Sequence, residues 1–288
     1  MRRLVTGRLV FLLSATFASD LGSIQLVPSS TVQHVSTASG VRFGVLGQMR
    51  QAPSPTLFIF ATNFETSLAD PNYARVGHIL AQEGYLCVSL DLPSHGEDLR
   101  ANEPQGLQGW QVRLDNLEDF LPGFLAKVSD VLDHLIRAGF TDPARIAVCG
   151  TSRGGFIALH AAAKDSRIQC VAAFAPVTNL AALKEFQGAS ENPLVKNYAV
   201  TTKAEALASN AVWIMIGNDD TRVNTDDAIA LARGIVKAGS ARKKTAQIQL
   251  HLMPSEGHRT PPTAHEDAAR WILSILGSGR SVEKPAPK

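Results

Sequence analysis

The sequence has few cysteines, and this scarcity excludes two classes of protein. Among its 288 residues there are three, Cys87, Cys149 and Cys170. Any disulfide pairing leaves one of them unpaired, and their spacing fits no cysteine-based metal site. Each lies in an apolar run of strand length, where cysteine usually acts as a small buried hydrophobic residue. A disulfide-stapled fold and a cysteine metal site are therefore both excluded.

An excess of charge of one sign and a long hydrophobic run are also missing. The chain has 28 Lys and Arg against 26 Asp and Glu, a net charge of +2. Proteins that bind nucleic acid normally carry a basic excess or a basic stripe. No interior stretch reaches the roughly 18 uninterrupted apolar residues of a membrane span. We expect no nucleic-acid partner and no stable span in the mature chain, and the sequence leaves the oligomeric state open.

The first 18 residues differ from the rest of the chain. Three arginines precede the apolar run 9–13, and small residues follow up to Ala18. This order of basic, apolar and small segments resembles a secretory signal peptide that is cleaved after Ala18. The alternatives are a ragged N-terminal helix and an anchor. The pattern predicts a secreted or periplasmic protein, with a cytoplasmic location as the alternative.

From Val32 to Leu276, short apolar runs alternate with longer amphipathic segments. The strand-like runs are 41–46, 56–61, 85–90, 145–149, 170–175, 211–216 and 246–252. The helical segments are 73–82, 120–138, 154–163, 225–238 and 263–276. Such alternation is typical of the α/β class, with a mostly parallel sheet covered by helices on both faces. We predict one catalytic domain over 32–276 and a disordered tail over 277–288.

The clearest chemical motif follows the strand-like run 145–149. Residues 150–154 read Gly-Thr-Ser-Arg-Gly, a G-x-S-x-G motif between a strand and a small-residue helix. In that context the serine occupies a strained turn that projects its hydroxyl, and only small residues fit at the two glycine positions. The turn also aims the next backbone N–H and the helix N-terminus at a developing oxyanion. We predict Ser152 as the nucleophile and the amide of Arg153 as one oxyanion donor.

A serine nucleophile needs a general base and an acid that orients the base. Two adjacent carboxylates, Asp219 and Asp220, follow the run 211–216. Either could solvate a turn or cap the next helix; we favour Asp220 as the orienting acid. His258 follows the last strand-like run on a loop, and we predict it as the base. Five other histidines lie within predicted helices or strands, where a structural role is more common: His78, His134, His160, His251 and His265.

The order Ser, Asp, His, each just after a strand, resembles that of the α/β-hydrolases. The resemblance is strongest to the dienelactone-hydrolase and prolyl-oligopeptidase-like branch, over residues 41–276. The family pattern Gly-x-x-Asp-x-x-Val matches 217–223, Glu-Gly-His matches 256–258, and Asp-x-Pro-x-His-Gly matches 91–96. The resemblance implies the α/β-hydrolase fold and a Ser-His-Asp triad that needs no metal or organic cofactor. It also implies that Asp91 and His95 shape the site wall and are structural.

The chain departs from the family pattern after the strand-like run 56–61. The family usually has His-Gly there, whereas this sequence has Thr62 and Asn63, followed by Phe64. We expect the amide of Phe64 to complete the oxyanion hole, with the side chain of Asn63 as another donor. A second departure is the serine nucleophile, because dienelactone hydrolases often use cysteine. The serine favours ester or peptide chemistry.

These patterns predict a serine hydrolase that cleaves a small carboxylic ester through an acyl-enzyme, within the EC 3.1.1 class. The core pattern begins near residue 41, which leaves no room ahead of it for the propeller of prolyl oligopeptidases. The alternatives are a serine peptidase or amidase with the same residues, and a non-catalytic binding protein on the same fold. Substrate selection is expected in segments 94–118 and 178–208.

Three side chains near the predicted site have two interpretations each. Trp110 and Phe186 either line an apolar acyl pocket or anchor their loops to the core. Arg153 either reaches an acidic group of the substrate or forms a surface salt bridge.

Overall fold

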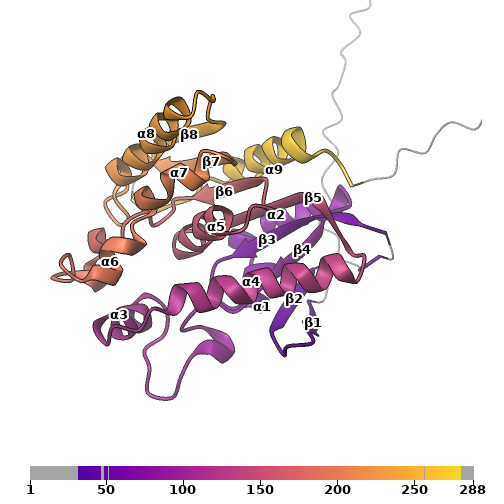
Figure 1. The fold of residues 1–288 in the computed structure, drawn as a ribbon, viewed down its shortest axis with the longest axis horizontal. Helices are drawn as coiled ribbons and strands as arrows, with labels where there is room; N and C mark the ends of the chain where they lie inside the picture. The colour runs from indigo at the N-terminus through magenta and orange to yellow at the C-terminus, as the bar shows by residue number, and fades with distance from the viewer. Residues whose placement is uncertain (1–31, 47–48, 51, 256, 280–288) are drawn as a thin grey trace, which may run out of the picture.

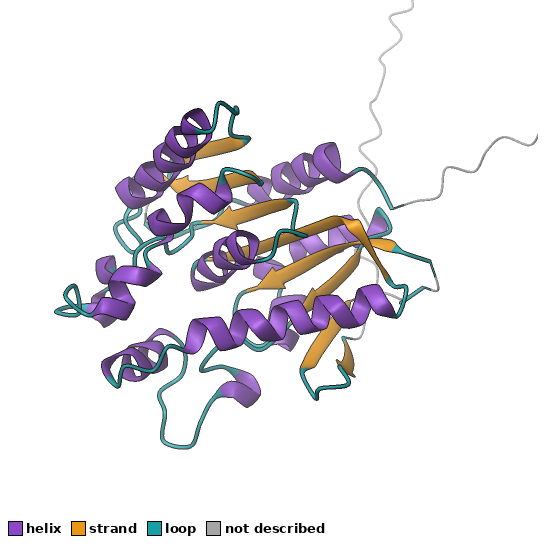
Figure 2. Ribbon diagram, viewed as in Figure 1, coloured by secondary structure: helices purple, strands orange, loops and turns teal. Residues whose placement is uncertain are grey.

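The protein is described by a computed structural model over residues 32–46, 49–50, 52–255 and 257–279. Within these ranges, one sheet is covered by helices on both faces (Figures 1 and 2). The predicted signal peptide, residues 1–18, lies outside the described residues, as do Glu256 and residues 280–288 of the predicted tail. The predicted α/β-hydrolase fold class is confirmed.

The sheet has eight strands in the order β1-β2-β4-β3-β5-β6-β7-β8. Their bounds are β1 Gln33–Ser36, β2 Arg42–Leu46, β3 Ser54–Phe60, β4 Leu86–Ser89, β5 Thr141–Thr151, β6 Cys170–Phe174, β7 Ala211–Gly217 and β8 Ile248–Met253. The pairs β1–β2 and β2–β4 are antiparallel, and all the others are parallel. The arrowheads of the parallel strands point to one end of the molecule (Figure 2). In such a sheet, ligands bind beyond the carboxyl ends of the strands.

The helices form two layers, each with its own hydrophobic core. Their bounds are α1 Phe64–Ala69, α2 Pro71–Gln82, α3 Leu107–Asp115, α4 Phe120–Arg137, α5 Arg153–Lys164, α6 Pro193–Tyr198, α7 Ala204–Leu207, α8 Thr225–Ala241 and α9 Pro262–Leu276. Helices α1, α2 and α9 pack on one face, whereas α4, α5 and α8 pack on the other. A sheet buried on both faces explains why its central strands are apolar at nearly every position.

Three elements differ from the sequence prediction. The strand β1 and the helices α1 and α3 were not expected. The residues of β1 are mostly exposed and polar, so it carries no apolar signal and is held by pairing with β2. The helix α3 lies in a polar segment, but its Leu107, Trp110 and Leu114 are buried in the core. The glycines and polar residues around them hid this helical pattern in the sequence.

The beginning of the predicted tail contacts the domain. The amide of Gly279 donates to the carbonyl of Glu83 at 2.7 Å, and the Tyr85 hydroxyl donates to the carbonyl of Gly277 at 2.7 Å. These bonds join Gly277 and Gly279 to the end of α2 and the start of β4. Disorder of the tail over 277–288 stays a prediction.

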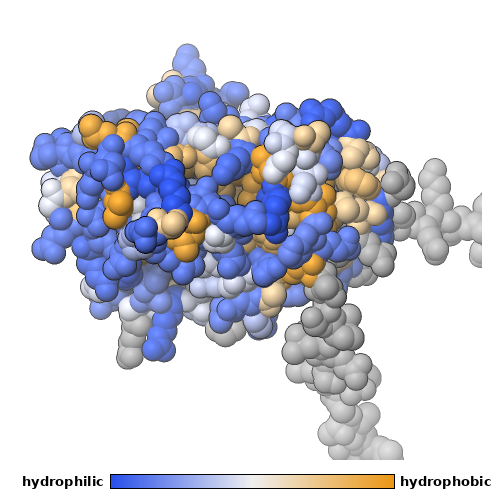
Figure 3. Space-filling view, turned by 90° about the horizontal axis from the view of Figure 1, so that it is seen from below, coloured by the Kyte–Doolittle hydropathy of each residue, from blue (hydrophilic) through white to orange (hydrophobic). Residues whose placement is uncertain are grey.

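The surface shows no continuous apolar face in the view of Figure 3. That face is mainly hydrophilic, with hydrophobic side chains in separate small patches. Scattered exposed hydrophobic residues are normal on soluble domains. Among the described residues, no helix is both long enough and apolar enough to cross a membrane.

Candidate active site

Ser152 occupies a strained turn between β5 and α5. Its backbone has φ 57° and ψ −116°, a region that residues other than glycine rarely adopt. Hydrogen bonds to neighbouring strand ends hold the turn: the Ser152 amide donates to the carbonyl of Phe174 at 2.9 Å, and its own carbonyl accepts from Val177 at 3.1 Å. The surrounding structure thus fixes the conformation that the motif predicts for a nucleophile.

The two motif glycines allow β3, β5 and α5 to approach closely. A Cβ atom at Gly154 would overlap the carbonyl group of Phe60 at the end of β3. A Cβ atom at Gly150 would overlap the carbonyl group of Gly154 itself. Both obstacles are backbone atoms, which cannot move aside as a flexible side chain would. Larger residues at either position would therefore displace the turn that carries Ser152.

Asp220 and His258 form a hydrogen-bonded pair. Nδ1 of His258 lies 2.8 Å from Oδ2 of Asp220, whose side chain is buried at the end of β7. The other carboxylate oxygen accepts from the amides of Arg222 at 3.1 Å and Val223 at 3.3 Å. Burial alone would raise the pKa of Asp220, but the hydrogen bond and charge of His258 and the two amides outweigh it and lower the pKa. Asp219, the alternative acid, is exposed.

This pairing sets the roles of the two imidazole nitrogens. A carboxylate accepts a hydrogen bond, so Nδ1 of His258 is the donor and Nε2 is left to act as a base. Ser152 and His258 line the same cavity of about 320 Å³ at the carboxyl ends of the strands. Among the described residues, no hydrogen bond joins the Ser152 hydroxyl to His258. Such bonds are often long in unliganded enzymes and tighten when substrate binds.

The amides of the predicted oxyanion hole differ in their hydrogen bonding. The amide of Arg153 is at the first position of α5, where a helix supplies no acceptor of its own. The amide of Phe64, by contrast, donates to Oδ1 of Asp91 at 2.9 Å. The side-chain oxygen of Asn63 accepts from the Thr66 amide at 2.8 Å and caps α1. The Phe64 amide therefore already has a carboxylate as its acceptor, and its role in an oxyanion hole stays a prediction.

Asp91 and His95 have structural contacts, as the sequence predicted. Asp91 accepts from the amides of Phe64 and Glu97, both at 2.9 Å, and so joins the turn after β3 to the segment after β4. Nδ1 of His95 lies 2.9 Å from the carbonyl of Pro93. Burial lowers the pKa of His95 to about 4, so this imidazole is neutral near pH 7.

Trp110 and Phe186 anchor their segments to the core and do not line the cavity beside Ser152. Both side chains are almost fully buried. The indole N–H of Trp110 donates to the carbonyl of Pro93 at 2.7 Å, and its ring packs against Phe120 and Phe156. Of the two interpretations of these aromatic residues, the structure favours the anchoring one.

Several cavity residues were not singled out from the sequence as lining the site. They include Tyr73 on α2, Arg222 after β7 and His265 on α9. His265 stacks on Phe174 with ring centroids 4.8 Å apart, and burial lowers its pKa to about 4. Nothing in the local sequence marks these residues, because each lies within or beside an ordinary helix or loop and is brought to Ser152 by the fold.

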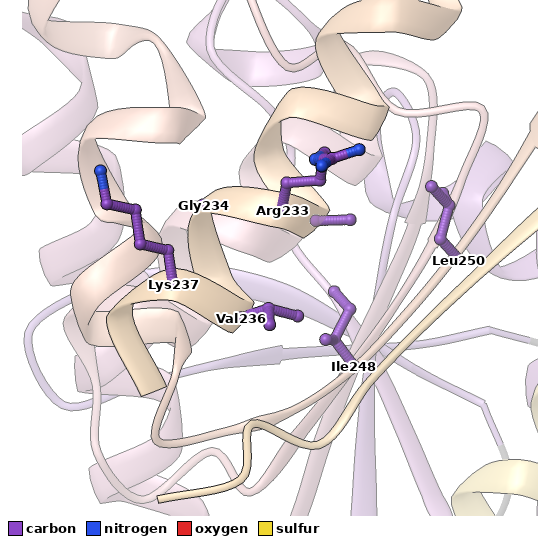
Figure 4. Close-up of a pocket in the computed structure, with 7 residues that line it drawn as sticks. Arg233, Gly234, Val236, Lys237, Ile248 and Leu250 are labelled. Atoms are coloured by element: carbon purple, nitrogen blue, oxygen red, sulfur yellow. The ribbon is translucent and has the colours of Figure 1, made fainter. Parts of the chain in front are cut away.

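A larger hollow of the described surface lies elsewhere. A space of about 640 Å³ lies between α8 and β8, and Val236 and Ile248 line its apolar part (Figure 4). The side chains that line it include no hydroxyl, thiol, carboxylate or imidazole. In the described part of the chain, no three His, Cys, Asp or Glu side chains are grouped so that they could hold a metal ion. The chemistry therefore belongs to the smaller cavity beside Ser152.

Comparison with known proteins places the chain in a family. The sequence profile described as the prolyl oligopeptidase family matches residues 125–278, which are more than half of the chain and include the turn of Ser152, Asp220 and His258. The chain belongs to the prolyl oligopeptidase family. As a member of this family it is a serine hydrolase, which agrees with the expectation from its motifs.

Individual relatives of this family member are distant. The esterase YjfP of Escherichia coli is 25% identical over 244 residues, which are 79% of this chain and 91% of that protein. Among solved structures, TT1662 from Thermus thermophilus has a TM-score of 0.64 at 16% identity, and the match covers 87% of this chain and 99% of the TT1662 chain. Oligopeptidase B from Leishmania major has a TM-score of 0.63 at 14% identity over 88% of this chain, which spans 37% of that protein. These two structures establish the shared fold.

Proposed function

We propose that the protein hydrolyses a small carboxylic ester, with Ser152 as nucleophile, His258 as general base and Asp220 as the residue that orients His258. The observation that carries the proposal is the 2.8 Å hydrogen bond between His258 and a buried Asp220, beside a cavity that Ser152 also lines. A buried carboxylate on one imidazole nitrogen fixes the tautomer that a serine nucleophile requires. Family membership and the esterase YjfP, whose length the chain matches, support the same conclusion.

The reaction begins when the Ser152 oxygen attacks the ester carbonyl and its proton passes to Nε2 of His258. The Arg153 amide and the N-terminus of α5 stabilise the resulting oxyanion, and such a donor typically contributes about 3 kcal/mol to lowering the barrier. The carbon–oxygen bond of the ester breaks, and the leaving alcohol takes the proton from His258. Water then attacks the acyl-enzyme with His258 again as base, which releases the carboxylic acid and restores Ser152.

Peptide or amide hydrolysis is the competing proposal, because the same residues could perform it and oligopeptidase B shares the fold. We favour the ester because YjfP, which this chain matches over 91% of the length of YjfP, is named an esterase. Comparing p-nitrophenyl butyrate with peptidyl p-nitroanilides separates the two. A higher kcat/KM for the anilides would replace the ester proposal by the peptidase one.

The decisive test combines activity with labelling. We expect the protein to release p-nitrophenol from p-nitrophenyl butyrate and to react with a fluorophosphonate probe at Ser152. The Ser152→Ala variant should lose both properties, whereas Ser166→Ala, which removes an exposed hydroxyl, should keep them. An active Ser152→Ala variant, or a label mapped to another residue, would reject the proposed nucleophile.

We also propose that the protein is exported, on the basis of the signal-like order of residues 1–18 alone. The test is to express the full chain in a bacterial host, recover it from the periplasm or medium and sequence its N-terminus. A mature chain that begins at residue 19 is expected. A protein that stays in the cytoplasm and keeps residue 1 or 2 at its N-terminus would contradict export.

A further inference from the structure

The guanidinium group of Arg153 lacks an acidic partner in the described part of the chain. Its Nε donates to the carbonyl of Ala61 at 3.1 Å, which ties the side chain to the end of β3. No described carboxylate lies within ion-pair distance, so the surface salt bridge considered from the sequence is not found. The side chain lines the cavity beside Ser152, and its two terminal nitrogens are not among the buried atoms without a partner. They are therefore open to a group that enters the cavity.

A buried arginine elsewhere in the domain shows what burial of such a charge normally requires. Arg113 is buried, and it pairs with Asp98 at 2.7 Å and Glu103 at 2.6 Å. Burying a cation without a counter-charge is costly, and buried charges are usually paired. Arg153 is half-buried: burial is the largest cause that lowers its pKa, Arg222 also lowers it, and Tyr73 and Glu185 raise it. The fold thus maintains, beside the nucleophile, a half-buried positive charge that has no ion-pair partner among the described residues.

Arg222 adds to the positive character of the cavity. One of its terminal nitrogens donates to Glu185 at 2.7 Å, while the other is buried without a partner. Glu185 can balance only one of the two arginines, and the described residues that line the cavity include no carboxylate. Near pH 7 the cavity therefore carries two guanidinium groups, of which only that of Arg222 has a carboxylate, Glu185, within ion-pair distance; the nearby Asp220 is paired with His258.

We propose that this cavity selects esters that carry a free carboxylate close to the scissile bond, and that Arg153 is the specificity-determining residue. The proposal rests on the proposed function and names its substrate class. A guanidinium binds a carboxylate through two parallel N–H donors, which fix the position of the ligand as well as its charge. Because Arg153 directly follows the nucleophile, the same residue would stabilise the oxyanion through its amide and hold the substrate carboxylate through its side chain.

The first experiment compares two esters that differ in one charge: p-nitrophenyl hemiadipate and p-nitrophenyl methyl adipate. Hydrogen bonds to charged groups are strong enough that we expect kcat/KM to favour the hemiadipate about tenfold or more. In Arg153→Gln this ratio should fall to about one, and in Arg153→Lys part of it should remain. The ratio compares the two esters in the same variant. A general loss of activity lowers both kcat/KM values equally and therefore leaves the ratio unchanged. High salt should lower the ratio of the native protein.

The matched control is Arg233→Gln, which removes an arginine that lines the distant hollow between α8 and β8. It should keep the ratio of the native protein. A second pair of esters, 4-acetoxybenzoate and its methyl ester, places the carboxylate on the leaving group. A preference for the anion in either pair that Arg153→Gln abolishes supports the proposal. The pair that shows it tells which side of the ester carries the charge.

A binding measurement keeps this inference separate from the proposed function. In Ser152→Ala, calorimetry should show hemiadipate bound about tenfold tighter than the methyl diester, and the added Arg153→Gln change should remove the difference. Failure of the native protein to hydrolyse any of these esters would reject the proposed function, and this binding difference would still decide the inference. Equal affinity for the two compounds, or a preference that Arg153→Gln leaves unchanged, would overturn it.

Discussion

Two adjacent strands, β3 and β5, each lead into a helix at the same end of the sheet. The turns after them differ in which polar groups are left without a hydrogen-bond partner. In the turn after β5, Ser152 has a left-handed backbone, and the amide of Arg153 and the Ser152 side chain remain available at the cavity. In the turn after β3, the Thr62 amide donates to the Ser67 hydroxyl at 3.1 Å, and the Phe64 amide donates to Asp91. One turn keeps its polar groups for a ligand, and the other uses them to hold itself together.

The comparison shows that position in the fold does not settle a residue's role. Both turns lie where α/β proteins bind their ligands. What separates them is whether neighbouring side chains have already satisfied the backbone donors. An amide that donates to a buried carboxylate has little to offer a developing oxyanion, however near it lies.

The largest expected effect tests the acid–base pair that serves the β5 turn. Asp220→Asn should lower kcat for p-nitrophenyl butyrate by about 10⁴-fold, because an amide no longer fixes the tautomer of His258. Asp219→Asn is the matched control, since it makes the same change on the adjacent exposed residue, and its kcat should match that of the native protein. Equal losses in the two variants would show that the pair observed in the structure is not the functional one.

The next test addresses the close packing of the same turn. Gly154→Ala should lower the free energy of unfolding by about 2 to 3 kcal/mol, since the added Cβ overlaps a backbone carbonyl of β3. Gly123→Ala on α4 places its Cβ in open space and should instead raise stability by up to about 1 kcal/mol. Urea unfolding of the two variants measures both changes. A Gly154→Ala protein of native stability would show that the turn is looser than described.

A change in the β3 turn should affect stability more than catalysis. Asp91→Asn removes one of the two acceptors that serve the Phe64 and Glu97 amides, and it should lower the free energy of unfolding by about 1 kcal/mol. Because both amides already donate to Asp91, kcat should stay within a few-fold of the native value. If kcat instead fell by about a hundredfold with stability retained, this turn would have to take part in catalysis.

A further test concerns pH. Burial lowers the pKa values of His95, His160 and His265 to about 4, against 6.5 for a free histidine. Between these values the unfolded chain binds more protons than the folded one, so stability should fall as pH decreases from about 6.5 to about 4. Each histidine contributes a slope of at most about 1.4 kcal/mol per pH unit.

His160 is the best of the three histidines for testing this slope, because it lies outside the cavity and contacts the Tyr198 carbonyl at 3.0 Å. Urea unfolding between pH 4.5 and 7 should show a shallower dependence on pH in His160→Gln than in the native protein. An unchanged slope in His160→Gln would mean that burial does not lower the pKa of this imidazole in the folded state.

The sequence predicted well those parts of the site that local order determines. The strand, Gly-x-Ser-x-Gly and helix order is contiguous, and Asp220 and His258 each follow a strand, so their convergence follows from the topology of a parallel sheet. The hydrogen-bond partner of the Phe64 amide could not be predicted from local sequence order. The partner of its amide is a carboxylate 27 positions further along the chain, and only folding brings the two together.

The cavity lining was equally hidden. Tyr73 and His265 lie on α2 and α9, whose sequences are those of ordinary amphipathic helices, and the packing of these helices brings them to Ser152. The helix α3 was missed because its few apolar residues are separated by glycine and charged residues. Tertiary contacts, which a linear pattern does not contain, decide all of these cases.

The order in which the strands supply the reacting groups affects the protein during its synthesis. The chain leaves the ribosome from its N-terminus, so Ser152 emerges well before Asp220, and His258 emerges last, beyond β8. A nascent or C-terminally shortened chain that ends before His258 contains the serine hydroxyl without the imidazole that we propose as its base. Hydrolytic activity would therefore begin only once nearly the whole domain has been made, which would spare esters inside the producing cell from an unfinished enzyme.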